Sequence, residues 1–225
     1  MITLDEEGYG FAATRIDADV CDALAAALPP PERGRGGVRN LLAHPLVVAF
    51  LRSPAVRELA PLIGKPACAV KATLFDKTAA ANWKVPWHQD RAIAVAERID
   101  APGFGPWSRK RGVLHVEPPA EVLASMLALR LHLDDCGPDD GPLRILPGTH
   151  RLGALSASSI AALAAERKPV TLTASKGDVL LLRPLLVHAS SPARTPGHRR
   201  VLHIELARDD AAAPLRWATA LPLLD

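Results

Sequence analysis

The feature of this 225-residue chain that most constrains its fold is a set of three metal-ligating residue types divided between two distant segments. His88 and Asp90 lie two residues apart, and His188 lies far along the chain. On an extended segment His88 and Asp90 point to the same side, because strand side chains alternate with a period of two. The three ligands therefore meet only if the fold pairs strands that are far apart in sequence.

Two histidines and one carboxylate bind a metal on one face and leave the opposite coordination positions open. This ligand set is typical of non-haem Fe(II) oxygenases, in which the open positions take a co-substrate and O2. The apolar run before His188 predicts one buried strand over residues 178–188, which delivers the histidine at its end. These residue types and their spacing therefore indicate an iron site.

Two other pairs repeat the pattern of a histidine followed two residues later by an acid. The pair His203/Glu205 has no later histidine to complete a set of three. The pair His132/Asp134 lies in an alternation of leucine and polar residues, which predicts a strand over 127–134. We therefore expect His132 to line a barrel interior, and we place the metal at His88, Asp90 and His188.

A candidate anion-binding residue follows the last histidine. Arg199 lies eleven residues after His188 and enters a predicted strand over 199–207. A guanidinium is suited to a carboxylate, because its rigid fork donates two charge-assisted hydrogen bonds. Together with the three ligands, Arg199 fits an Fe(II) site that binds a dicarboxylate co-substrate.

Four segments in this order resemble the phytanoyl-CoA dioxygenase family of Fe(II)/2-oxoglutarate oxygenases. They are the Trp-His-Gln-Asp segment 87–90, the turn and strand 140–150, the Gly-Asp pair 177–178 with the segment 188–192, and Arg199. Two positions depart from the family pattern: Asp140 replaces an asparagine and Thr149 a serine, and neither removes a ligand. Together these blocks span residues 73 to about 206, more than half of the chain.

The resemblance implies roles for individual residues. His88, Asp90 and His188 would ligate Fe(II), and Arg199 would hold the far carboxylate of 2-oxoglutarate. Two further residues match positions that contact the co-substrate in some members, namely Lys77 and Arg130. Halogenating relatives replace the ligand acid with a small residue, so the presence of Asp90 favours hydroxylation or a related oxidation.

The resemblance implies a dioxygenase that hydroxylates a small molecule, with release of succinate and CO2 and with ascorbate as support in vitro. The short chain and the polar barrel positions Arg130 and His132 favour a polar or anionic substrate. The same cofactors would also serve desaturation, cyclisation or epimerisation. Two other classes stay open, a cupin-like metal protein (an isomerase or lyase) and a 2-oxoglutarate sensor. The expected substrate contacts are Trp87, Gln89, Trp107, Lys110, His115 and His132.

Composition excludes several other classes. The net charge of +3 comes without any tract of lysines and arginines, which argues against a nucleic-acid partner. No apolar run reaches the length of a membrane span. The three cysteines show no paired metal spacing and indicate free thiols in a reducing compartment. The acidic N-terminus lacks the pattern of a signal peptide, so we expect a cytoplasmic protein.

The expected fold is a single domain over 1–225, mainly β with flanking helices. A helical N-terminal part (about 1–66) precedes a double-stranded β-helix, the cupin-like jelly-roll barrel (about 67–208). An irregular insertion over 92–125 is expected to form a lid over the iron. The basic stretch 33–39 is interpreted as a loop near the mouth of the site. Helices are predicted over 17–28, 38–51, 54–63 and 156–167, and strands over 67–77 and 170–174.

Overall fold

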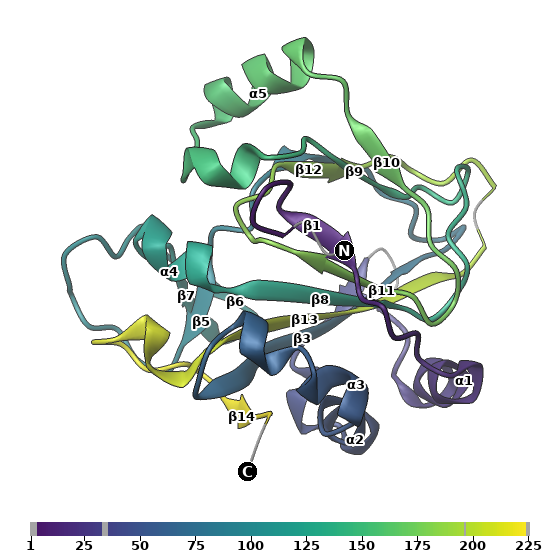
Figure 1. Cartoon of the computed structure of the whole chain (residues 1–225), viewed down its shortest axis with the longest axis horizontal. Coiled ribbons are helices and arrows are strands. Elements are labelled where there is room, and N and C mark those ends of the chain that lie inside the picture. Colours follow the sequence, from purple (N-terminus) through teal and green to yellow (C-terminus); the bar gives the residue numbers. More distant parts are fainter. Residues whose placement is uncertain (1–3, 33–35, 196, 224–225) are drawn as a thin grey trace.

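Two antiparallel sheets face each other and form the body of the protein (Figure 1), seen in a computed structural model that describes residues 4–32, 36–195 and 197–223. The large sheet has the strand order β1-β11-β8-β13-β3-β14, and β2 also pairs with β3. The strands of this sheet are β1 (Tyr9–Phe11), β2 (Gly37–Val38), β3 (Ala67–Lys77), β8 (Leu127–His132), β11 (Val179–Leu182), β13 (Arg199–Arg208) and β14 (Leu221–Pro222).

The second sheet has four strands in the order β10-β9-β12-β4. Its strands are β4 (Val85–His88), β9 (Leu143–Ile145), β10 (Val170–Leu172) and β12 (His188–Ser190). A small third sheet in the order β5-β7-β6 lies beside them. It contains β5 (Ile93–Val95), β6 (Trp107–Lys110) and β7 (Val113–Val116). The prediction of a mainly β, jelly-roll fold is confirmed.

Helices cover the outer faces of this sandwich. The N-terminal helices lie on the face of the large sheet that points away from the second sheet, and α5 lies beyond the second sheet (Figure 1). The α-helices are α1 (Ala18–Ala27), α2 (Pro45–Leu51), α3 (Pro54–Arg57), α4 (Ala120–Ser125) and α5 (Ala157–Glu166). Short 3₁₀ turns are η1 (Leu41–Ala43), η2 (Ala60–Leu62), η3 (Thr149–Leu152) and η4 (Asp209–Ala212). No helix in the described ranges is long and apolar enough to cross a membrane.

Strand alternation separates the core from the site. On β8, Leu127, Leu129 and Leu131 belong to the largest apolar cluster, which the large sheet shares with α1 and α2. The intervening residue Arg130 points to the opposite side and lines a cavity between the sheets. On β13, Leu202 likewise faces the helices. The period of two therefore sends apolar side chains to one face and polar ones to the other.

The single strand predicted over 178–188 is wrong. β11 ends at Leu182, and β12 begins only at His188 in the other sheet. Pro184 has no N–H to donate to a sheet, and a turn closes where the N–H of Leu186 donates to the carbonyl of Arg183. This crossing carries His188 away from β8 and places it beside β4.

Three other expectations need correction. The insertion over 92–125 is not irregular, since it forms β5, β6, β7 and α4. The N-terminal part is not only helical, because β1 and β2 join the large sheet. The helix predicted over 38–51 is divided, with η1 preceding α2. Residues 33–35 of the predicted basic loop lie outside the described residues.

Candidate metal centre

His88 and His188 face each other across a pair of antiparallel strands. They are direct partners in the register of β4 and β12, and their ring centroids lie 4.2 Å apart. Asp90 follows β4, with its Oδ1 3.6 Å from Nε2 of His88 and its Oδ2 3.7 Å from Nε2 of His188. One ligand atom from each of the three side chains lies within 4.8 Å of the others. The three residues are therefore close enough to share one metal ion.

Backbone carbonyls fix the orientation of both imidazoles. Nδ1 of His88 lies 2.9 Å from the carbonyl oxygen of Pro86, and Nδ1 of His188 lies 2.8 Å from that of Leu186. Because a carbonyl oxygen only accepts, each Nδ1 carries the proton and donates it. Each Nε2 then presents a lone pair toward Asp90, as a metal ligand requires.

The charges at the centre suit a divalent cation. Burial would raise the pKa of Asp90, but the neighbouring His188 and His88 outweigh it and hold that pKa well below its usual range. Burial lowers the pKa of His188 to about 4, so its imidazole is neutral at neutral pH. Burial also acts to lower the pKa of His88, but the hydrogen bond and charge of Asp90 raise it overall.

The segment 140–150 stabilises the chain next to His188. The Thr149 hydroxyl donates to the carbonyl of Leu146 at 2.7 Å and accepts from the N–H of Val187 at 2.9 Å. Thr149 thus ties the end of this segment to the residue before His188. At Gly141, φ is +65°, and a Cβ would lie 2.4 Å from the carbonyl oxygen of Ser191. Only glycine fits there, which explains why Gly141 follows Asp140 in the sequence.

Thr149→Val is expected to lower the free energy of unfolding by about 1–3 kcal/mol, because it leaves the buried N–H of Val187 without an acceptor. Urea denaturation of the two proteins measures this difference. Thr149→Ser keeps the hydroxyl and serves as the matched control, so it should stay close to the wild-type value. A loss in Thr149→Ser as large as that in Thr149→Val would contradict the role of the hydroxyl, because serine keeps it.

Two buried guanidinium groups line a cavity of about 480 Å³ that also contains the three ligands. Arg199 and Arg130 are 6% and 7% exposed, and the Nε of each has no hydrogen-bond partner. Among the described residues neither has a carboxylate partner. Such buried, uncompensated cations are costly unless an anion binds them. This end of the cavity is therefore suited to an anion.

Lys77 lies next to this end of the cavity. It is the register partner of Arg199 on β3, and its Nζ donates to Ser190 Oγ at 3.0 Å and to the carbonyl of Ser191. Burial and the charge of Arg199 lower the pKa of Lys77 to about 8. Lys77 does not line the cavity and lies beside Arg199 on the neighbouring strand.

The expected substrate contacts divide into two groups. Lys110 and Gln89 line the cavity. The Gln89 amide is already used, because its Nε2 donates to two backbone carbonyls and its Oε1 accepts from the N–H of Leu155. Gln89 therefore braces the loops around the centre.

The other four predicted contacts do not line this cavity. Trp87 packs under Arg144, at 5.2 Å from the guanidinium carbon to the ring centroid. Trp107 packs in the same way with Arg98 at 5.3 Å. Two buried histidines point elsewhere, His115 toward the carbonyl of Val113 and His132 into the interior beside Arg130. Strand position alone did not reveal these directions.

Several cavity residues were not anticipated from the sequence. They are Lys71, Thr73, Phe75, Trp83, His203 and Glu205, whereas Arg39 belongs to the basic stretch that was expected near the mouth of the site. Those on β13 follow a simple signal, because His203 and Glu205 continue the inward alternation that begins at Arg199. The pair fails as metal ligands, yet it lies in the same cavity as the centre. Those on β3 face them in register, Thr73 opposite His203 and Lys71 opposite Glu205.

Residues 8–201 match the sequence profile of phytanoyl-CoA dioxygenase, most of the chain. The chain is a member of the phytanoyl-CoA dioxygenase family. The predicted family relationship is thereby confirmed. A search of the curated proteins found no match.

Solved structures share the fold of this family member at low sequence identity. AviO1 from Streptomyces viridochromogenes Tue57 is 24% identical, with 94% of each chain covered and a TM-score of 0.65. EctD from S. alaskensis, solved with 2-oxoglutarate and 5-hydroxyectoine, is 19% identical, with 92% of this chain and 74% of that chain covered and a TM-score of 0.68. The epimerase SnoN from nogalamycin biosynthesis is 18% identical, with 92% and 80% covered and a TM-score of 0.62.

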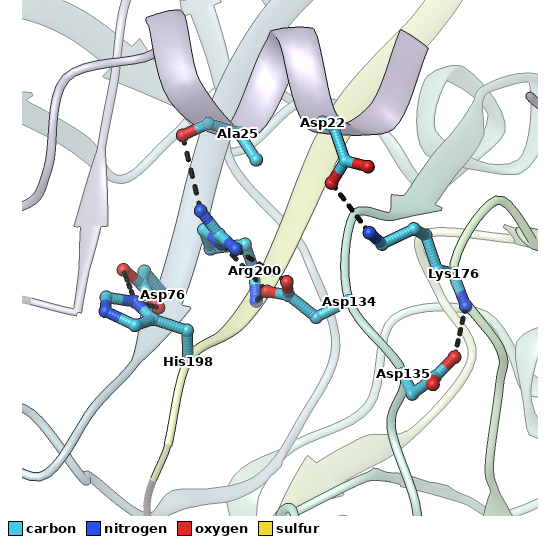
Figure 2. A network of polar contacts seen from close by, with 8 residues as sticks. All are labelled: Asp22, Ala25, Asp76, Asp134, Asp135, Lys176, His198 and Arg200. Carbon is cyan, nitrogen blue, oxygen red and sulfur yellow. Dashed lines mark hydrogen bonds and ion pairs between the residues drawn. The ribbon is translucent and has the colours of Figure 1, made fainter. Parts of the chain in front are cut away.

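A polar network in this family member fixes Arg200, the neighbour of Arg199 on β13 (Figure 2). The neighbouring Arg200 forms a two-pronged ion pair with Asp134 at 2.7 and 2.8 Å and donates to the carbonyl of Ala25 in α1. Because side chains alternate, fixing Arg200 on the outer side directs Arg199 into the cavity. Lys176 joins the same surface to α1 through Asp22, at 2.6 Å.

Proposed function

We propose that this protein is an Fe(II)- and 2-oxoglutarate-dependent dioxygenase that hydroxylates a small molecule. The observation that carries the proposal is one cavity that holds the three ligands and two buried arginines without carboxylate partners. EctD, a relative in fold, was solved with bound Fe and with 2-oxoglutarate. Those structures support the choice of metal and co-substrate.

Each residue has a defined task in this proposal. His88, Asp90 and His188 would hold Fe(II), and Arg199 would donate to the far carboxylate of 2-oxoglutarate, with Lys77 and Arg130 adding positive charge. The chemistry supplied by bound Fe(II) is the use of O2 to convert 2-oxoglutarate into succinate and CO2 and a substrate C–H into C–OH. One oxygen atom ends in succinate and the other in the hydroxyl group.

The test is succinate formation and O2 uptake by purified protein supplied with Fe(II), ascorbate and 2-oxoglutarate, with His188→Ala as the comparison. Turnover without a substrate is a known side activity of such centres, so no substrate has to be chosen. Succinate that depends on His188 supports the proposal. No succinate, together with no binding of 2-oxoglutarate to the metal-loaded protein, would favour a cupin-like isomerase or lyase. Binding without turnover would favour a sensor.

Epimerisation is a second candidate, favoured by the fold shared with the epimerase SnoN. Both reactions consume 2-oxoglutarate and depend on the same ligands, so succinate does not separate them. Incorporation of ¹⁸O from labelled O2 does. Once a substrate is found, a hydroxylated product gains the label, whereas an epimerised product has the mass of its substrate.

Binding of 2-oxoglutarate is expected to take up protons at about pH 9, where Lys77, with its pKa near 8, is mostly neutral. A bound dianion beside Arg199 favours the protonated amine, so affinity falls as pH rises above the pKa of free Lys77. Calorimetry in two buffers of different ionisation enthalpy measures the uptake. Lys77→Met should abolish it and Lys168→Met, at an exposed position, should not. Equal proton uptake in Lys77→Met would exclude Lys77 as its source.

A further inference from the structure

Three basic side chains meet at the end of the cavity away from Arg199. Arg39 follows β2, Lys71 lies on β3, and Lys110 is the last residue of β6. All three line the cavity that contains His88, Asp90 and His188. Separate elements therefore converge to place positive charge there.

Most of this charge has no partner. Nζ of Lys71 lies 2.6 Å from Oε1 of Glu205 in a partly buried ion pair. Arg39 and Lys110 have no acidic partner in the described ranges of the chain. Burial lowers the pKa of Lys110, and the charges of Lys71 and Arg39 lower it further. The three cations are therefore near enough to repel one another.

Bound metal and 2-oxoglutarate would not neutralise this unpaired positive charge. The cavity lining holds six basic side chains and three carboxylates. Glu117 pairs with Arg91, Glu205 pairs with Lys71, and Asp90 is committed to the metal. The two negative charges of 2-oxoglutarate would be taken up by the metal and by the arginine end. Arg39 and Lys110 would still lack an anion.

The two positive ends are separate sites. Lys71 pairs in register with Glu205, whereas Lys77 pairs with Arg199, six residues further along β3. At about 3.3 Å per residue these positions lie roughly 20 Å apart. Thr73, buried and with an unpartnered Oγ1, lies between them. One molecule of 2-oxoglutarate is too short to occupy both ends.

The cavity also continues outward past Arg39. A neighbouring cavity of about 300 Å³ shares Arg39, Thr73 and Trp83 with the first and adds Arg111. Within the described part of the chain, the acidic partner of Arg111 is the exposed Glu32, at the long distance of 3.8 Å. The outer chamber is therefore basic as well, and it offers room for a charged group.

We infer, on the basis of the proposed function, that the substrate carries an anionic group, a carboxylate or a phosphate, which Arg39, Lys71 and Lys110 bind at the cavity mouth. This places the oxidised C–H between that anchor and the metal. Two polar side chains in the middle of the cavity, Thr73 and His203, would contact the part of the substrate near the metal. Of the expected substrate contacts, Lys110 would therefore bind the anionic group.

The test uses two anions as probes on ¹⁵N-labelled, Zn(II)-loaded protein saturated with 2-oxoglutarate, followed by NMR. Inorganic phosphate and acetate are titrated separately, with glycerol as the uncharged control. Saturable shifts near Arg39 and Lys110 are expected with the anions and not with glycerol. The anion that binds more tightly identifies the class of group. Arg39→Gln with Lys110→Gln should weaken binding at least about tenfold.

Lys168→Gln is the matched control, since it removes one positive charge at an exposed position outside the cavity. It should bind both probes like the wild type. Unchanged anion affinity in the Arg39→Gln/Lys110→Gln protein would overturn the inference, as would equal shifts with glycerol. If 2-oxoglutarate fails to bind, the proposed function fails, and the same titrations on Arg199→Ala protein still test the outer anion site.

Discussion

Asp90→Ala is expected to abolish 2-oxoglutarate turnover, with a loss of at least about a hundredfold in kcat. Loss of residues that only orient a metal ligand already costs about 10–100-fold, and Asp90 is proposed as a ligand itself. The substitution also removes the only carboxylate of the three-residue set, whose charge offsets that of the cation. Succinate formation measures the loss.

The comparison for this variant is Asp100→Ala, which removes an acid that is 82% exposed and paired with Arg98 outside the cavity. Its turnover should equal that of the wild type. Asp90→Ala protein should also lose bound iron. Its iron content therefore distinguishes loss of the metal from a defect in substrate access. Wild-type kinetics in the Asp90→Ala protein would exclude Asp90 as a ligand.

Arg199→Ala is expected to raise the Kd for 2-oxoglutarate about a hundredfold or more, whereas kcat at saturating 2-oxoglutarate changes far less. Removing one partner of a buried charge pair costs about 2–5 kcal/mol, and about 1.4 kcal/mol corresponds to a factor of ten. Equilibrium binding to the metal-loaded protein measures the change.

The Kd of Arg199→Lys protein for 2-oxoglutarate should lie between those of the wild type and Arg199→Ala, because lysine keeps the charge but lacks the fork that matches a carboxylate. Arg194→Ala, at an exposed position paired with Asp139, is the control and should bind 2-oxoglutarate normally. A normal Kd in Arg199→Ala would move the anion-binding role to Arg130 or Lys77.

Local patterns in the sequence were sufficient for much of the fold. The leucine alternation of β8 predicted a strand, as did the segment that forms β13, and both strands are present and almost entirely buried. The helix predicted over 156–167 is α5, capped by the side chain of Ser156, which accepts from the N–H of Ser159. These features depend on neighbours a few residues away, which a single sequence contains.

Non-local features were harder to predict. The break after Leu182 depends on Pro184 and on a hydrogen bond to Gly8, near the other end of the chain. Periodicity does not separate a strand that continues from two apolar segments in different sheets. The hairpin formed by β6 and β7 was hidden by its charges and by the glycines and prolines that flank it, and so was its effect of bringing Lys110 to the cavity.

In the candidate site, too, local features were predicted from the sequence and non-local ones were not. The spacing of His88 and Asp90 on an extended segment was enough to join them, and the apolar run that ends at His188 indicated the third ligand before the resemblance to the family added support. Whether a polar side chain reaches the cavity depends on contacts that no local pattern contains. The Gln89 amide, for example, is consumed by backbone groups of Gly153, Leu155 and Leu185.

The most direct test of the central claim is anaerobic dialysis of the protein against Fe(II) with and without 2-oxoglutarate, comparing the wild type with His188→Ala. We predict stoichiometric iron in the wild type, held more tightly when 2-oxoglutarate is present, and little iron in the variant under either condition. Equal iron in both proteins, or wild-type iron binding that 2-oxoglutarate leaves unchanged, would contradict the assignment of this cavity as an Fe(II)/2-oxoglutarate site.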